Sequence, residues 1–180
     1  MSRAPAQSYP PQAFESAMVF VDGTNLFHRL EAEKLVVANL RNVFDDMCRP
    51  RQLHRIYVYT TEEHLARAKK IHGNDFLSEC RIVLGDAIPT GDGNFREKGV
   101  DALLVADLIY HAAMKNCQFA FVVTHDSDFY YALRRVEDFG CRTAVVAIGP
   151  NAPERLRNAS DHYVHRTRGD LIQRNLAGSR

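Results

Sequence analysis

The residues best suited to chemistry stand in one short run, Thr124-His125-Asp126-Ser127-Asp128, directly after the apolar segment 119–123. Neighbouring carboxylates repel each other unless a cation or a proton lies between them, so this run favours a metal site or a proton-transfer site. A simpler alternative is helix capping. Ser127 or Asp128 is expected to cap the helix that follows, because Ser and Asp are favoured N-caps. Capping by either residue does not require Asp126.

Two further segments carry an acid in a comparable position. Asp22 follows the apolar run 17–21, and Asp101 opens an apolar helical pattern just after Lys98-Gly99. In a parallel sheet, the carboxyl ends of the strands and the amino ends of the following helices share one edge, where ligands bind. These acids converge there if the strands at 17–21 and 119–123 are adjacent. Carboxylates without matching His or Cys ligands suit Mg²⁺ or Mn²⁺, ions that activate water for in-line phosphoryl chemistry.

Several of these residues also have a plainer interpretation. Asp101 could simply favour the helix macrodipole, an effect worth about 0.3–1 kcal/mol. Asp107, His111 and Lys115 have the spacing of a solvated helix stripe, which is the interpretation we favour for the last two. For Asp107, two interpretations are equally plausible: a residue of the solvated stripe, or an acid that supports the metal ligands without contacting the metal. His125 is either a ligand or general acid, or, more simply, an exposed turn residue.

Alternating segments predict how these residues are positioned. Apolar, β-branched or aromatic runs predict strands at 17–21, 54–59, 81–84, 119–123 and 141–148. Helical patterns lie between them, from residue 26, over 35–47, from 60 to about 76, from 100 to about 115, and from 129. This alternation predicts an α/β fold with a mainly parallel sheet and right-handed crossovers.

The remaining segments define the domain organisation. Residues 1–16 are rich in Pro, Ala, Ser and Gln and are expected to form a disordered leader. A single domain is expected over 17–168, followed by a C-terminal helix or tail over 169–180. Residues 85–99 are expected to form one long loop. The helix from residue 100 is apolar around most of its circumference, so we expect it to be wedged deep against the sheet.

Bulk properties narrow the class of protein. The 180 residues are 46% hydrophobic and 25% charged, which is typical of an ordinary globular protein. The net charge of +1 means that a polyanion must be met by a local patch of charge. Four scattered cysteines without a C-x-x-C pair fit a reduced protein. The amino terminus lacks the apolar core of a signal peptide, and no apolar run reaches the ~20 residues of a membrane helix, so we expect a cytoplasmic protein without a membrane partner.

Three blocks of sequence resemble a known family. FVDGTN at 20–25, KGVD at 98–101 with Asp107 six residues on, and VTHDSDF at 123–129 resemble the signature blocks of NYN-domain proteins, which belong to the PIN-like nuclease superfamily. The resemblance covers about residues 17–165, including NASD at 158–161, which is similar to a late element of bacterial members. It implies a PIN-like three-layer α/β/α sandwich with a five-stranded or six-stranded sheet. It also implies a ribonuclease that uses Mg²⁺ or Mn²⁺ to activate water.

The resemblance also implies roles for individual residues. Asp22, Asp101 and Asp126 would hold the metal, Asp128 would assist directly or through water, and Asn25 would position water or a phosphate. The sequence departs from the bacterial members at one point, where they usually have Ser-Gly and this chain has Thr124-His125. A histidine in place of glycine narrows the approach to the site, which would alter the substrate or the rate.

Substrate contacts are expected beside the acids. The candidates next to the site are Arg96, Lys98, Thr124 and Ser127, and a second group lies in the arginine-rich end of the chain at Arg155, Arg157, Arg166 and Arg168. A solvated surface explains these arginines equally well. Tyr130 and Tyr131 are expected to pack in the core or a groove rather than to stack on bases.

Other classes of protein fit the sequence less well. A haloacid-dehalogenase-type phosphatase needs an Asp at the position of Phe20, and a dinucleotide fold needs G-x-G-x-x-G after the first strand. The main alternative is a non-catalytic RNA-binding or scaffold protein, although idle clustered carboxylates would cost stability. The expected partner is RNA, with single-stranded DNA as an alternative. A homodimer would lengthen a basic groove.

Overall fold

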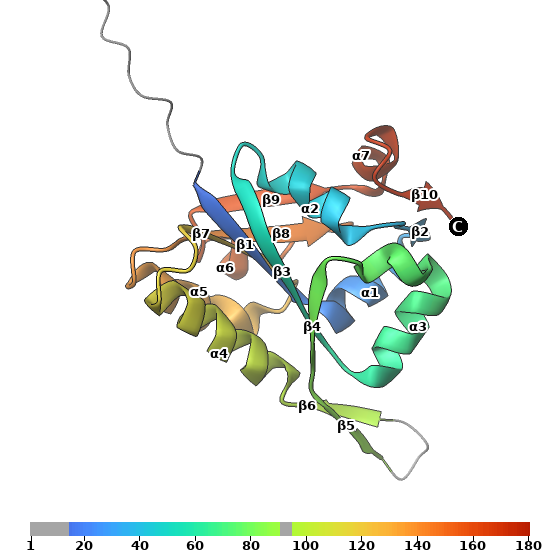
Figure 1. Cartoon of the computed structure of the whole chain (residues 1–180), viewed down its shortest axis with the longest axis horizontal. Helices are drawn as coiled ribbons and strands as arrows, with labels where there is room; N and C mark the ends of the chain where they lie inside the picture. The colour runs from blue at the N-terminus through green and yellow to red at the C-terminus, as the bar shows by residue number, and fades with distance from the viewer. Residues whose placement is uncertain (1–14, 91–94) are drawn as a thin grey trace, which may run out of the picture.

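Strand β1 (Ser16–Asp22) lies at the centre of a six-stranded sheet in the computed structural model, which describes residues 15–90 and 95–180, without the side chains of residues 95 and 96 (Figure 1). All strands of this sheet are parallel, in the order β4-β3-β1-β7-β8-β9. The other five strands are β3 (Gln52–Thr60), β4 (Cys80–Leu84), β7 (Phe119–Val123), β8 (Arg142–Ile148) and β9 (His162–Arg166). The predicted parallel sheet is confirmed, and it has the six-stranded form.

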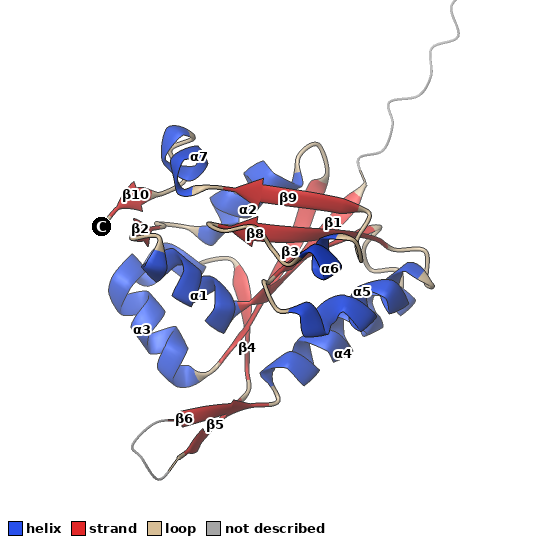
Figure 2. Cartoon of the chain, turned by 180° about the vertical axis from the view of Figure 1, so that it is seen from behind, coloured by secondary structure: helices blue, strands red, loops and turns tan. Residues whose placement is uncertain are grey.

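Helices cover both faces of the sheet and complete a three-layer sandwich (Figures 1 and 2). One face carries α1 (Gly23–Ala32), α2 (Leu40–Cys48), α3 (Glu62–His72) and α7 (Arg168–Gln173), and the other carries α4 (Val100–Ala113), α5 (Tyr130–Glu137) and α6 (Glu154–Arg157). Side chains alternate between the faces of a strand. Val19 and Val21 of β1 therefore pack into one hydrophobic core, and Met18 and Phe20 into the other.

The strands that carry the acids are neighbours, as predicted. β1 pairs with β7 in a register that sets Val21 opposite Val123. Asp22 and Thr124, the next residue along each strand, therefore leave the sheet side by side at its carboxyl edge. Asp22 and Thr124, which are 102 positions apart in the sequence, therefore lie next to each other.

The helical pattern predicted over 35–47 is wrong in its first part. Leu35–Val36 form strand β2, which pairs antiparallel with β10 (Gly178–Ser179), and α2 begins only at Leu40. Asn39 caps α2, because its side chain accepts a hydrogen bond from the amide of Asn42 at 3.3 Å. The partner strand lies so far along the chain that periodicity cannot reveal it.

Helix α3 ends four residues before the predicted boundary. Gly73 follows His72 with φ of +94°, a value that glycine adopts readily and other residues do not. The 3₁₀ helix η1 (Asn74–Leu77) then carries Phe76 into the core. The glycine therefore ends the helix while the apolar pattern continues.

Two other expectations also need correction. The expected loop 85–99 contains the antiparallel strands β5 (Asp86–Pro89) and β6 (Phe95–Lys98), which project beyond the sheet next to β4 (Figures 1 and 2). Helix α4 is buried along one stripe only, because Leu104 and Leu108 are fully buried while Leu103 is 38% exposed. It is a surface helix of the outer layer rather than one wedged deep into the fold.

The ends of the chain and the cysteines complete the description. The expected disordered leader falls mostly on residues 1–14, which lie outside the described residues, and Ser16 already begins β1. All four cysteines are free. No helix among the described residues is long and apolar enough to span a membrane.

Candidate active site

Asp22 links the end of β1 to the start of α1. Its carboxylate accepts hydrogen bonds from the amide of Asn25 at 3.1 Å and from the hydroxyl of Thr124 at 2.9 Å, and the residue is only 7% exposed. The hydrogen bond from the Asn25 amide makes Asp22 the N-cap of α1. Gly23 is required at the next position, because a Cβ there would lie 2.7 Å from the carbonyl oxygen of Tyr59. The turn therefore holds this carboxylate in one place.

The protonation of Asp22 reflects its burial. The pKa of this carboxyl group is raised from its ordinary 3.8 to about 6, mainly by burial and to a smaller degree by the charges of Asp101 and Glu97. The hydrogen bonds from Asn25 and Thr124 act in the opposite direction and limit the rise. Asp22 is therefore an acid that gains most from a nearby cation.

The run after β7 is ordered by its own side chains. The Thr124 hydroxyl accepts a hydrogen bond from the amide of Asp126 at 3.0 Å, and the Asp126 carboxylate accepts one from the amide of Asp128 at 2.9 Å. The second bond caps the 3₁₀ helix η2 (Ser127–Phe129), which leads into α5. The expectation that Ser127 or Asp128 is the cap is therefore wrong, because Asp126 caps.

Asp101 approaches the same edge from the first turn of α4. Burial raises its pKa, and so do the facing charges of Asp126, Glu97 and Asp128, in that order. Asp101 and Asp128 also line a small cavity of about 130 Å³ together with Ala102, Val105 and Phe129. The carboxylates predicted from three separate segments thus face one another across a single edge of the sheet.

These oxygens do not form a finished metal site as they stand. Within the described residues, no three His, Cys, Asp or Glu side chains are arranged so that they could hold a metal ion together. The donor chemistry still fits Mg²⁺ or Mn²⁺, because carboxylate and amide oxygens predominate and no cysteine belongs to the cluster. None of Asp22, Asp101, Asp126 and Asp128 forms an ion pair with a basic side chain in the described part of the chain.

Glu97 is a further acid of this edge that the sequence patterns did not single out. It accepts a hydrogen bond from the Thr24 hydroxyl at 2.6 Å and lies 3.1 Å from Nδ1 of His64. Its charge also raises the pKa of Asp22 and of Asp101. The sequence feature that could have pointed to Glu97 is its position directly before Lys98-Gly99, next to the segment that carries Asp101. Glu97 attaches strand β6 to helices α1 and α3 beside the site.

His125 is fixed between the first turn of α1 and the loop after β8 instead of being an exposed turn residue. Its Nδ1 lies 3.2 Å from the side-chain oxygen of Asn25, and its Nε2 lies 2.9 Å from the carbonyl oxygen of Pro150. Burial lowers the pKa of this imidazole, which favours the neutral ring. His125 therefore contacts the very residue, Asn25, to which the resemblance gives a positioning role.

Asp107 is separated from the edge and is held by a tyrosine. The hydroxyl of Tyr59, fully buried in β3, donates to the Asp107 carboxylate at 2.9 Å. Six residues of α-helix separate Asp107 from Asp101, a rise of roughly 9 Å. Asp107 therefore ties α4, the helix that presents Asp101, to the sheet.

The expected substrate contacts are divided by the structure. Lys98 is exposed and Ser127 is half-buried, whereas the side chain of Arg96 lies outside the described part of the structure. Thr124 is 1% exposed and both of its hydrogen bonds are to protein, so we assign it to positioning Asp22 rather than to substrate contact.

The arginines of the last segment do not form one patch. Arg166 pairs with Asp46 at 3.7 Å, and Arg168 donates to the carbonyl of Glu33 at 3.0 Å on the other side of the sheet. Arg155 lies 4.6 Å from the ring centre of Tyr130. Tyr130 packs against the core as expected, and Tyr131, although 71% exposed, lines a surface groove with Val105 and Ile109.

The fold and its acidic edge define a class of protein. A six-stranded parallel sheet between two helical layers, with acids where β1 and β7 end and α4 begins, is the PIN-like nuclease fold predicted above. The NYN-domain family model matches residues 16–169, and the chain belongs to this family, whose members are generally nucleases.

Comparison with solved structures supports the same fold. The chain resembles a protein of unknown function from Vibrio parahaemolyticus RIMD 2210633, with a TM-score of 0.64 and 16% sequence identity. The match covers 87% of this chain and 96% of the Vibrio protein. No curated protein matches the sequence. At this identity the structural likeness extends to the fold alone.

Proposed function

We propose that this protein is a metal-dependent ribonuclease that hydrolyses phosphodiester bonds in RNA. The observation that carries the proposal is the set of carboxylates that face each other without a basic partner. Burial and mutual repulsion raise the pKa of Asp22 and of Asp101. An arrangement that costs stability in this way is typical of a site that binds a cation.

The proposed cation is Mg²⁺ or Mn²⁺, with Asp22, Asp101 and Asp126 as the residues that would hold it. Mg²⁺ keeps several water molecules in its coordination shell, so it can be held by few direct ligands. This property fits an edge at which, in the described part of the chain, no three acidic, histidine or cysteine side chains are placed to hold an ion together. When bound, such an ion would polarise the phosphate and make an attacking water molecule more acidic.

The remaining residues of the edge would position the reactants. Asp128 is exposed beside the cavity that Asp101 lines, where it can accept a proton from water. Asn25 presents its amide from the first turn of α1 and would orient water or a phosphate oxygen. Thr124 keeps the Asp22 carboxylate in place through its hydroxyl hydrogen bond. Asp107, through Tyr59, would keep α4 in register with the edge.

RNA is the proposed substrate, with Lys98 as a proposed basic contact and Arg96, two residues earlier in the sequence, as a second candidate. Exposed Lys98 ends strand β6, next to the helix that presents Asp101. Contacts between lysine or arginine and phosphates release counterions, so affinity should fall steeply with added salt. An affinity that does not change with salt would exclude these contacts.

The direct test is cleavage of end-labelled single-stranded RNA with Mg²⁺, with Mn²⁺ and with EDTA. Asp126→Asn keeps an oxygen that can accept the amide hydrogen bond of Asp128, so it removes the charge while it retains the cap. We expect cleavage with either metal, none with EDTA, and a loss of about 10²-fold or more in the variant, the size typical of a lost charge-stabilising group. Asp138→Asn is the matched control, because its carboxylate belongs to an exposed pair with Arg135.

The alternative is an RNA-binding protein whose acidic edge is inactive. The observation that favours it is the position of His125, whose ring lies within hydrogen-bond distance of Asn25 and Pro150. Bacterial members usually have glycine at the position of His125. Binding of RNA without cleavage by either wild type or Asp138→Asn would support this alternative. Metal-dependent cleavage that Asp126→Asn abolishes would exclude it.

A further inference from the structure

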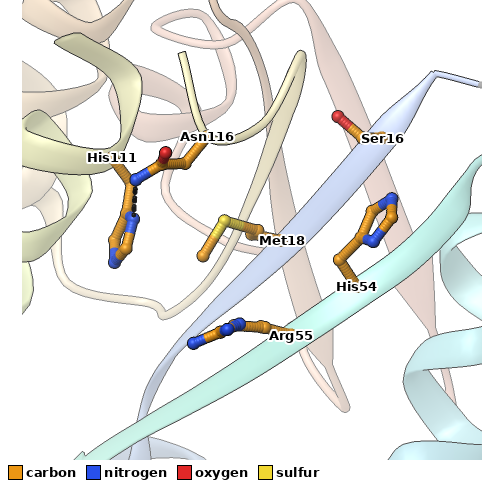
Figure 3. A pocket seen from close by; sticks show the side chains of 6 residues that line it. All are labelled: Ser16, Met18, His54, Arg55, His111 and Asn116. Atoms are coloured by element: carbon orange, nitrogen blue, oxygen red, sulfur yellow. Dashed lines mark hydrogen bonds between the residues drawn. The ribbon is translucent and has the colours of Figure 1, made fainter. Parts of the chain in front are cut away.

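A second cavity lies at the opposite end of the sheet from the acidic edge. It has a volume of about 470 Å³ and is lined by Ser16, Met18, His54, Arg55, His111 and Asn116 (Figure 3). Ser16 and Asp22 are at the two ends of β1, and at about 3.3 Å per residue they are separated by roughly 20 Å. The cavity is therefore distinct from the candidate active site.

The lining of this cavity is basic and rich in hydrogen-bond donors. Arg55 and His54 come from the start of β3, and His111 and Asn116 come from the last turn of α4 and the residues after it. No carboxylate is among the described residues that line the cavity. Arg55 is exposed and forms no ion pair with any described acid. An unpaired guanidinium in a concave surface is suited to an anion, because its donors match phosphate and carboxylate oxygens.

His111 is oriented so that it presents a second donor. The side-chain amide of Asn116 lies 2.8 Å from Nδ1 of His111 and donates to it (Figure 3). A neutral imidazole that accepts at one nitrogen carries its proton on the other, so Nε2 is left as a donor. The ring packs at 5.1 Å from Tyr57, which restricts its movement. His111 is therefore a fixed and half-buried residue, not part of the solvated stripe expected from its spacing.

The carboxylate of Asp107 partly offsets the basic groups around His111. Burial lowers the pKa of His111, the charge of Asp107 acts against this, and the smaller effects of Arg55 and Arg81 lower the pKa as well. The Asp107 carboxylate is itself engaged by the hydroxyl of Tyr59. The carbonyl groups of residues 110–112 in α4 accept hydrogen bonds from the amides of residues 114–116. Arg55 lines the cavity itself, whereas Asp107 does not.

We infer that this cavity binds a phosphomonoester of nucleotide size, with Arg55, His111 and Asn116 around the phosphate. The volume lies in the range of small-molecule sites, about 300–1,000 Å³, and exceeds what a phosphate alone would fill. Met18 offers an apolar floor for the rest of the ligand. The ligand is either a free nucleotide or the phosphorylated end of an RNA chain, since both present the same group.

Calorimetric titration with adenosine 5′-monophosphate in EDTA tests the inference, with adenosine as the ligand that lacks the phosphate. We expect the monophosphate to bind at least about tenfold more tightly than adenosine, and Arg55→Gln to weaken its binding about tenfold or more, the size typical of a charge-assisted hydrogen bond. Arg81→Gln is the matched control, because Arg81 carries the same charge on the next strand but does not line the cavity. It should change affinity less than about threefold.

The active-site variant Asp126→Asn separates this inference from the proposed ribonuclease function. It should bind the monophosphate as the wild type does, whether or not the protein cuts RNA. Equal binding of adenosine, no binding at all, or no effect of Arg55→Gln would overturn the inference. A 5′-phosphorylated RNA tetramer distinguishes the two sources: tighter Arg55-dependent binding than the mononucleotide identifies a chain end, and equal or weaker binding identifies a free nucleotide.

Discussion

The hydroxyl of Thr124 donates to the carboxylate of Asp22 across the boundary between two strands, at 2.9 Å and a separation of 102 residues. The same hydroxyl accepts from the amide of Asp126, so one buried side chain connects two proposed metal ligands. The relative position of these ligands is therefore fixed by the sheet register and by this threonine.

Replacing Thr124 with valine should disturb the site without changing its shape. Thr124→Val leaves a buried carboxylate oxygen and an amide without their partner, which should lower the free energy of unfolding by about 1–3 kcal/mol. In the wild type, the hydrogen bond from Thr124 lowers the pKa of Asp22. Without this bond, the Asp22 carboxyl group of the variant should titrate at a higher pH. Urea unfolding and the acid limb of the cleavage profile measure the two effects.

Thr143→Val is the matched control for this change. Thr143 is also buried, and its hydroxyl accepts only the amide of Asp161, at 3.3 Å. It should lose stability but leave the acid limb of the profile unchanged. An equal shift of the acid limb in both variants would show that Thr124 has no special link to Asp22.

Removing the charge of Asp22 should stabilise the protein at neutral pH. The folded state takes up a proton on Asp22 near pH 6 and the unfolded state does so near 3.8, so this group stabilises the fold most below 3.8 and the contribution is lost as pH rises through 6. Asp22→Asn should therefore raise the free energy of unfolding by about 1–3 kcal/mol at pH 7 and by almost nothing below pH 4. A gain that does not depend on pH would contradict the assigned pKa.

His72 should produce the opposite trend on the other face of the sheet. The ring centres of His72 and Phe76 are 4.2 Å apart, and Nδ1 of His72 accepts a hydrogen bond from the amide of Val37 at 3.2 Å. Burial lowers the pKa of His72 to about 4. The stability from this neutral histidine is complete above pH 6.5 and is lost as pH falls towards 4, by up to about 3 kcal/mol. His72→Asn should show a flatter fall of unfolding free energy over this range. Identical acid profiles for wild type and variant would refute the prediction.

Replacing His125 with glycine should lower the stability of the fold and widen the approach to the acidic edge. His125→Gly removes the contacts with Asn25 and Pro150, which should cost about 1–2 kcal/mol of unfolding free energy. It also opens the approach to the acids, so cleavage of RNA per folded molecule should rise. His125→Asn serves as the control, since it keeps a polar side chain at the position. A fall in cleavage by the glycine variant, with the fold intact, would instead give His125 a direct role.

Much of the sheet could be predicted because its strands are buried on both faces. The runs 17–21 and 119–123 are continuous and apolar, so their existence and type are evident from the sequence. Strand β9 escaped prediction because it lies at the edge of the sheet, where exposed His162 and half-buried Tyr163 give it a mixed pattern. Strand β2 escaped because its partner β10 is more than a hundred residues away.

The acids of the site could also be predicted, but not the contacts that organise them. An acid after a buried strand is visible in sequence, as for Asp22 and Asp126. The assignment of the cap to Asp126, the position of Thr124 between two acids and the attachment of Glu97 to Thr24 depend on side-chain geometry. Arg166 and Arg168 were grouped by composition, although packing directs them to partners on the far side of the sheet.

Binding of Mn²⁺ tests most directly whether the facing carboxylates form a metal centre. In calorimetric titration near pH 7, the wild type should bind Mn²⁺ and Asp101→Asn should bind it at least about tenfold more weakly, while Asp138→Asn should bind it as the wild type does. Below pH 6, protons on Asp22 should compete and weaken the affinity, because the ligand must be ionised. Wild-type protein that binds no Mn²⁺, or binding that Asp101→Asn leaves unchanged, would contradict the proposed centre.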